Sequence, residues 1–241
     1  MSDRRRRERN FFTAMVVALV LSVVIGFIPT YYLRSSFPDS QQFAPPERFF
    51  YAIHGTVCSA WTVLILVQTW LVRGRHLALH RTLGMLGMVV AAGVMLTAMY
   101  GALLAGNREQ GFMAPPFAPE VFVLVPLLDA ALFGLLTGAA VVYRRKPQVH
   151  KRLILLGTLS MCQAALVRIT PIWEWSGPVV QLVMTLVFVV VLAVWDRRTM
   201  GRVHPVTLWV GFPLFFSEFL RFPIAMTETW QHIGRFLLGL I

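Results

Sequence analysis

Long apolar runs, separated by short polar segments, dominate the chain. A helix needs about 20 mostly apolar residues to cross the hydrocarbon core of a bilayer. The last such run is the weakest, because it contains Pro213 and ends in Glu218 and Arg221. The pattern predicts an all-α, polytopic transmembrane helix bundle of about seven spans. The predicted spans lie near residues 11–33, 50–72, 82–105, 120–143, 152–171, 178–195 and 205–220.

The composition supports a membrane protein. Hydrophobic residues make up 57% of the 241 residues and charged residues only 14%, whereas a soluble domain carries about 25% charged residues. This contrast argues against a soluble enzyme, a disordered chain and a disulfide scaffold. We expect a basic cytoplasmic N-terminus (1–10), one transmembrane domain (11–220) and a C-terminal tail (221–241). Thr227 is a candidate N-cap for a short interfacial helix in that tail.

Lysine and arginine gather in four of the short segments. Residues 1–10, 73–81, 144–152 and 196–202 hold five, three, five and three of the 22 lysines and arginines. Cytoplasmic loops carry such an excess of positive charge, so we expect the N-terminus in the cytoplasm and the C-terminus outside. The net charge of +11 then indicates orientation in a bacterial cytoplasmic (inner) membrane. It does not indicate nucleic-acid binding, and the lipid bilayer is the expected surrounding.

Ionisable side chains inside the predicted spans form a first candidate site. Each costs about 2.5–3.5 kcal/mol at a helix centre, so such groups are usually buried against partners. Asp129 and Arg168 would lower each other's burial cost as a pair. Alternatively, Arg168 reaches the interface and Asp129 makes one interhelical hydrogen bond. The predicted outer-half cluster consists of His54, Asp129, Arg168 and Glu218.

Two histidines at the inner ends of the third and fifth spans form a second candidate site. His80 and His150 sit at similar depth, above helix faces lined with small residues. Small residues allow close helix packing, but they also leave room for a haem b with one axial histidine from each helix. In that case Arg81, Lys151 and Arg152 are candidate partners of the haem propionates.

A metal ion is the alternative to haem at this place. His76 and His80 have the i, i+4 spacing that puts two side chains on one helix face, and His150 would complete a three-histidine set. Imidazoles suit zinc, copper or iron, although no acidic ligand is near in the sequence. The simpler interpretation is that each histidine is an interfacial residue beside basic neighbours.

Several motifs together resemble a widespread group of uncharacterised bacterial multi-span membrane proteins, over nearly the whole chain. The resemblance implies a membrane location and no particular activity. A looser similarity is to the ascorbate-linked transmembrane cytochromes b, in which His80 and His150 would match one of two haem-binding pairs, while Asp129 stands where His54 would need a histidine partner. The motifs are Pro29-Thr-Tyr-Tyr-Leu33, His54-Gly55, Leu79-His80-Arg81-Thr-Leu-Gly84, Leu128-Asp129, Arg144-Arg-Lys-Pro147-x-x-His150-Lys-Arg-Leu153 and Gly201-Arg-Val-His-Pro-Val-Thr-Leu-Trp209.

Three functions therefore stay open. The first is a haem-binding or otherwise histidine-ligated redox component that takes part in electron transfer. The second is a small-molecule transporter or binding protein that uses the intramembrane His/Asp/Arg cluster, and the third is an accessory subunit of a larger membrane complex. The chain has no Walker or GxSxG motif. A rhodopsin is unlikely, because the only lysines, Lys146 and Lys151, lie at the inner boundary.

Overall fold

The computed structural model describes residues 3–37, 47–108, 118–169 and 176–241, and within them every regular element is a helix. The predicted all-α bundle is confirmed. The elements in chain order are α1 (Asp3–Phe27), η1 (Ile28–Tyr32), η2 (Arg34–Ser36), α2 (Arg48–Arg73), α3 (Leu77–Gly106), α4 (Pro119–Phe122), α5 (Leu124–Val142), η4 (Tyr143–Arg145), α6 (Pro147–Met161), α7 (Gln163–Leu166), α8 (Ser176–Met200), η5 (Thr207–Gly211), α9 (Phe212–Ala225) and α10 (Glu228–Leu238).

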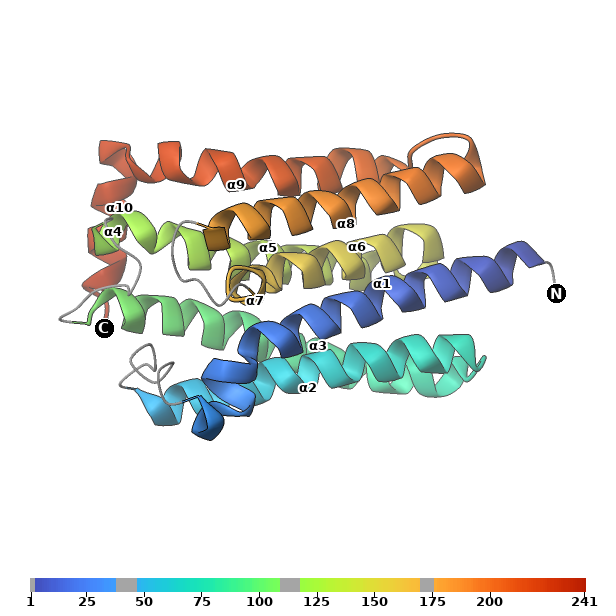
Figure 1. Ribbon diagram of the computed structural model, residues 1–241, viewed down its shortest axis with the longest axis horizontal. Coiled ribbons are helices and arrows are strands. Elements are labelled where there is room, and N and C mark those ends of the chain that lie inside the picture. Colours follow the sequence, from blue (N-terminus) through green and yellow to red (C-terminus); the bar gives the residue numbers. More distant parts are fainter. Residues whose placement is uncertain (1–2, 38–46, 109–117, 170–175) are drawn as a thin grey trace.

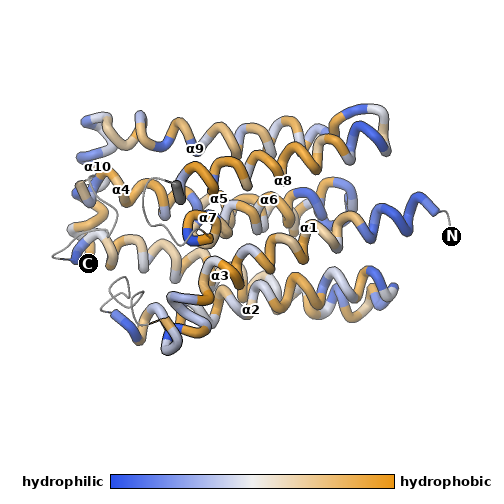
Figure 2. The backbone as a smooth tube through the Cα atoms, viewed as in Figure 1, coloured by the Kyte–Doolittle hydropathy of each residue, from blue (hydrophilic) through white to orange (hydrophobic). Residues whose placement is uncertain are grey.

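Six helical segments in the described residues are long and apolar enough to cross a membrane, so the chain is a multi-pass membrane protein. The long helices lie side by side along the long axis of the molecule in Figure 1, and the N-terminus and the C-terminus lie at opposite ends. Hydrophilic residues gather at the two ends and hydrophobic ones between them (Figure 2). We call the end with the N-terminus and the α2–α3, α5–α6 and α8–α9 turns the basic end, and the opposite one the far end.

The predicted fifth span is an interrupted helix. It forms α6 and the single turn α7, which are separated at Cys162. Side chains compete here for the backbone carbonyls that continue a helix: Gln163 Nε2 donates to Leu159 O at 3.1 Å, and Ser160 Oγ donates to Gly157 O at 2.8 Å. In Figure 1, α6 runs from the basic end towards the middle of the bundle, where α7 lies.

The core is centred on α6. Eight of its fifteen residues are buried, and α1, α5 and α7 pack around it. By contrast, α2, α3 and α8 present many large apolar side chains on the outside of the bundle, as lipid-facing helices do. At the far end, α10 packs against α4, and Thr227 caps it by accepting a hydrogen bond from Trp230 N at 3.2 Å. The expected C-terminal helix with its Thr227 cap is thus present.

Candidate functional site

A cluster of charged side chains lies inside the bundle near the far end. Arg221 on α9 donates through Nη2 to Asp129 Oδ1 on α5 at 3.0 Å and to Glu218 Oε1 at 2.9 Å. Gln181 on α8 donates through Nε2 to Glu218 Oε2 at 2.9 Å. These four residues, which we call the Arg221 cluster, join three helices.

The local sequence explains how the cluster forms. Glu218 and Arg221 are three positions apart on α9, so they share one face of that helix. Asp129 lies five residues after the start of α5, and Gln181 five residues after the start of α8, so all the partners meet at similar depth. Arg221 is 1% exposed and Glu218 6%, whereas Asp129 is half-buried.

The charges within the Arg221 cluster do not balance. Two carboxylates, Asp129 and Glu218, share one guanidinium. Moreover, Arg221 Nε and Nη1 are buried and have no hydrogen-bond partner in the part of the chain that the structure describes. Buried donors normally have partners, so the cluster has unused capacity for a hydrogen-bond acceptor and for one positive charge.

The four residues of the predicted outer cluster do not form one site. Asp129 and Glu218 are brought together, but their partner is Arg221 and not Arg168. Arg168 donates to Ala164 O on its own segment and lies over the Phe27 ring, 5.2 Å from its centroid.

His54 is also separate from the Arg221 cluster. Its Nδ1 is 2.9 Å from Thr97 Oγ1, which links α2 to α3, and its ring contacts Cys58 Sγ. Arg221 stands at the end of the last predicted span, but the predicted cluster did not include it, and Gln181 was not considered. The signals for both were present, because Arg221 follows Glu218 by one helical turn and Gln181 is an amide within an apolar run.

The two predicted haem-ligating histidines lie next to each other at the basic end. The ring centroids of His80 and His150 are 6.5 Å apart, with the ring planes at 89°. His150 Nδ1 is 2.8 Å from Ala140 O and donates a hydrogen bond to that carbonyl. Within the described residues, His80 Nδ1 and Gln68 Oε1 are buried without a hydrogen-bond partner.

This pair satisfies only part of what a haem requires. Metal–imidazole bonds of about 2.0–2.1 Å would put two ring centroids roughly 6 Å apart, close to the observed separation. Two of the three predicted propionate partners, however, are engaged elsewhere: Lys151 pairs with Glu8, and Arg152 pairs with Asp196. The separation of the two ring centroids thus matches that of two axial ligands, whereas Lys151 and Arg152 are already paired with carboxylates of the protein.

The three-histidine metal site does not form. His76 lies in the turn before α3, and its ring packs beside Gly74. In the described residues, no group of three or more histidine, cysteine, aspartate or glutamate side chains is placed to hold a metal ion. The i, i+4 spacing fails because α3 begins at Leu77, after His76.

A second buried ion pair, which the sequence did not reveal, lies at the basic end. Arg152 and Asp196 are 1% and 0% exposed and form a salt bridge between α6 and α8. Asp196 Oδ2 also accepts hydrogen bonds from His204 N at 3.2 Å and from Thr207 Oγ1 at 2.5 Å. Both oxygens of Asp196 are thus satisfied, which indicates a structural tie between α6, α8 and the α8–α9 turn.

The residues around this pair are also linked by hydrogen bonds. Arg152 Nη1 donates to Gln148 O and Oε1, both at 2.8 Å, and Gln148 Nε2 donates to Glu8 Oε1 at 2.7 Å. A cavity of about 20 Å³ beside them has room for a single water. Burial, and next the charge of Arg152, lower the pKa of His204 in the neighbouring turn.

Comparison with known proteins adds no further constraint. No protein-family model, no curated protein and no solved structure matches the chain. The Arg221 cluster and the histidine pair are therefore the features of the molecule that indicate a function.

Proposed function

We propose that this multi-pass membrane protein is a proton-linked carrier or binding protein for a small polar solute, with the Arg221 cluster as its binding site. The observation that carries the proposal is that two carboxylates, Asp129 and Glu218, share one buried guanidinium. Ionisable groups inside a membrane are costly and typically mark solute pathways or proton relays.

The charge count gives the site its chemistry. With both carboxylates ionised, the Arg221 cluster carries one negative charge in excess, in surroundings where an unbalanced charge is expensive. One proton, or one positively charged group of a solute, restores neutrality. Binding and release of the solute are then coupled to the protonation of Asp129 or Glu218.

The guanidinium supplies the second half of the site. Arg221 Nε and Nη1 point donor hydrogens at no protein acceptor in the described residues. A carboxylate or carbonyl group of the solute suits this planar fork of donors. We expect a solute that combines such an acceptor with a proton or an ammonium group. If the basic end faces the cytoplasm of a bacterial cell, the site lies in the outer half of the cytoplasmic membrane.

Proteoliposomes that enclose a pH-sensitive dye test this function. Amino acids, carboxylates and amines are added outside in turn, and the internal pH is followed for wild-type protein, Asp129→Asn and Glu120→Gln. Glu120 is the matched control, because its carboxylate lies at the same end and pairs with Arg235 outside the cluster. We expect one solute class to change the internal pH with wild type and Glu120→Gln, but not with Asp129→Asn. An unchanged response in Asp129→Asn, or no response to any class, would contradict the proposal.

The histidine pair supports a second candidate function, a histidine-ligated redox centre. The specific observation is the 6.5 Å separation of the His80 and His150 rings. A haem iron held by both rings would supply one-electron transfer. Protein purified from haem-replete cells should then show a Soret band that is lost in His80→Ala and His150→Ala. A colourless preparation would exclude the haem centre and leave the carrier proposal untouched.

A further inference from the structure

A groove of about 320 Å³ opens on the outside of α8 near the basic end. Its walls come from α8, the α8–α9 turn and the first residue of α9. The walls are apolar and the groove ends at two arginines. Its main lining residues are Val190, Val194, Val203, Phe212, Arg197 and Arg198.

The order of residues along α8 gives the groove a direction. Val190, Val194 and Arg197 follow one another with i, i+4, i+7 spacing, so they lie on one face of the helix. The apolar part belongs to the segment that is long and apolar enough to cross the membrane, and the arginines stand at its end. A phospholipid has the same order, an acyl chain in the bilayer followed by a headgroup at its surface.

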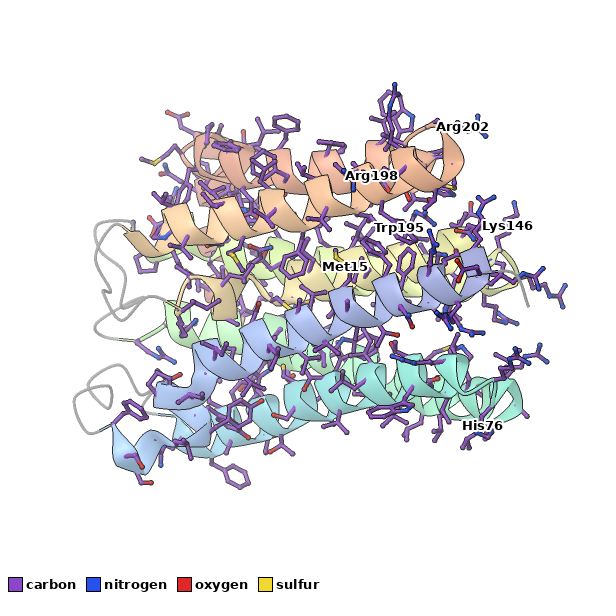
Figure 3. All side chains as sticks on the ribbon, turned by 45° about the vertical axis from the view of Figure 1, so that its right-hand side comes forward. Met15, His76, Lys146, Trp195, Arg198 and Arg202 are labelled. Carbon is purple, nitrogen blue, oxygen red and sulfur yellow. The ribbon has the colours of Figure 1, made fainter. Side chains whose placement is uncertain are left out.

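The positive charge at the end of the groove is not neutralised by the protein. Arg197 and Arg198 are exposed, and neither makes an ion pair within the residues that the structure describes. The adjacent acid, Asp196, is fully buried and faces Arg152 and Thr207 instead. Arg202, in the following turn, lies at the same end of the bundle as Arg198 (Figure 3).

We propose that this groove binds an anionic phospholipid. An acyl chain lies along Val190 and Val194, and the phosphate accepts hydrogen bonds from Arg197 and Arg198. Arginine presents paired donors that match phosphate oxygens, and basic pockets at the ends of membrane helices favour acidic headgroups. The buried Arg152–Asp196 pair contributes by holding the carboxylate of Asp196, the residue next to Arg197, inside the bundle.

Lipid retention by the purified full-length protein, measured by native mass spectrometry, tests the site. Phosphatidylglycerol and phosphatidylcholine with identical acyl chains are added to the protein in detergent. We expect wild type to prefer phosphatidylglycerol and the double variant Arg197→Gln/Arg198→Gln to retain it about tenfold less. Phosphatidylcholine retention should not change. The matched control, Arg144→Gln/Arg145→Gln, removes two exposed arginines of η4 at the same end and should behave like wild type.

Two outcomes would overturn the proposal. The first is an absence of headgroup preference in wild type, or an equal loss in the control variant, since general surface charge would then explain the binding. The second is displacement of the lipid by glycerol phosphate at a concentration similar to that of the lipid, because the apolar groove would then contribute nothing. Thermal unfolding of both double variants shows whether they fold, and exposed arginines at these positions should leave the unfolding temperature unchanged.

Discussion

Arg221 meets two carboxylates through a single nitrogen, Nη2, while Nε and Nη1 have no partner among the described residues. Arg152 shows the opposite state, since its guanidinium is surrounded by acceptors from Asp196 and Gln148. Buried ion pairs that are fully satisfied usually act as structural ties. The unmet donors and the excess carboxylate are what distinguish the Arg221 cluster from such a tie.

Replacement of Arg221 by methionine should destabilise the protein strongly. Glu218 and Asp129 lose the guanidinium that they share, and breaking a buried pair in this way costs about 3–5 kcal/mol. The free energy of unfolding, measured by denaturation with sodium dodecyl sulfate from mixed micelles, checks this. Arg235→Met is the control, because the Arg235–Glu120 pair is half exposed and should contribute about 1 kcal/mol or less. An equal loss of unfolding free energy in the two variants would show that the ion pairs of the Arg221 cluster stabilise the protein no more than a half-exposed pair does.

Protonation of His204 should weaken the fold in mild acid. Burial and the Arg152 charge hold the pKa of His204 below its ordinary 6.5, and the neutral ring accepts a hydrogen bond from Val206 N at 3.1 Å. The unfolded chain takes up a proton near pH 6.5 while the folded protein resists it, so stability falls as the pH drops from 6.5 to the lowered pKa and then levels off. Thermal unfolding between about pH 7.5 and pH 5 should show this loss in wild type but less of it in His204→Gln. The same pH dependence in both proteins would contradict the assignment.

At the scale of helices, hydropathy located the elements but not their interruption. The apolar run over 152–171 contains enough apolar residues for a span, yet α6 ends at Met161 and α7 covers only Gln163–Leu166, with Gln163 Nε2 donating to Leu159 O at the break. A hydropathy pattern averages over such local hydrogen bonds. The resulting short α7 packs against α1.

Gly26 should be required for the contact between α1 and α7. A Cβ at this position would lie 2.3 Å from Ala165 O, which is a backbone atom that cannot move aside. We expect Gly26→Ala to cost about 1–3 kcal/mol. Gly84→Ala is the control, because a Cβ there meets open space and alanine is the better helix former by up to about 1 kcal/mol. Unfolding in mixed micelles measures the free energy of unfolding of both variants. An unchanged value in Gly26→Ala would contradict the close approach of α1 to the Ala165 carbonyl.

At the scale of the whole molecule, the sequence predicts depth along the bundle but not rotation about each helix axis. Asp129, Arg168 and Glu218 were all placed in the outer half, and Asp129 and Glu218 do meet. Arg168 lies over Phe27 instead. The meeting of His80 and His150 was expected from their shared depth, whereas the buried Arg152–Asp196 pair was missed because both residues sit in segments that read as basic turns.

The path of the chain predicts which ends face the same compartment. The α2–α3 turn and the C-terminus lie at opposite ends of the bundle (Figure 1). Reporter fusions in bacteria test this. Green fluorescent protein fused at Gly74 should fluoresce, which places Gly74 in the cytoplasm, and alkaline phosphatase fused after Ile241 should be active, which places Ile241 outside. The same compartment for both positions would mean that α6 and α7 do not cross the membrane.

Reversible proton binding by the Arg221 cluster can be observed by infrared difference spectroscopy of the protein in lipid nanodiscs. A pH step across the neutral range should reveal a carboxyl C=O band in wild type and in Glu120→Gln. The band should be lost or shifted in Asp129→Asn and in Glu218→Gln. A spectrum without such a band, or one that neither cluster variant alters, would contradict the account.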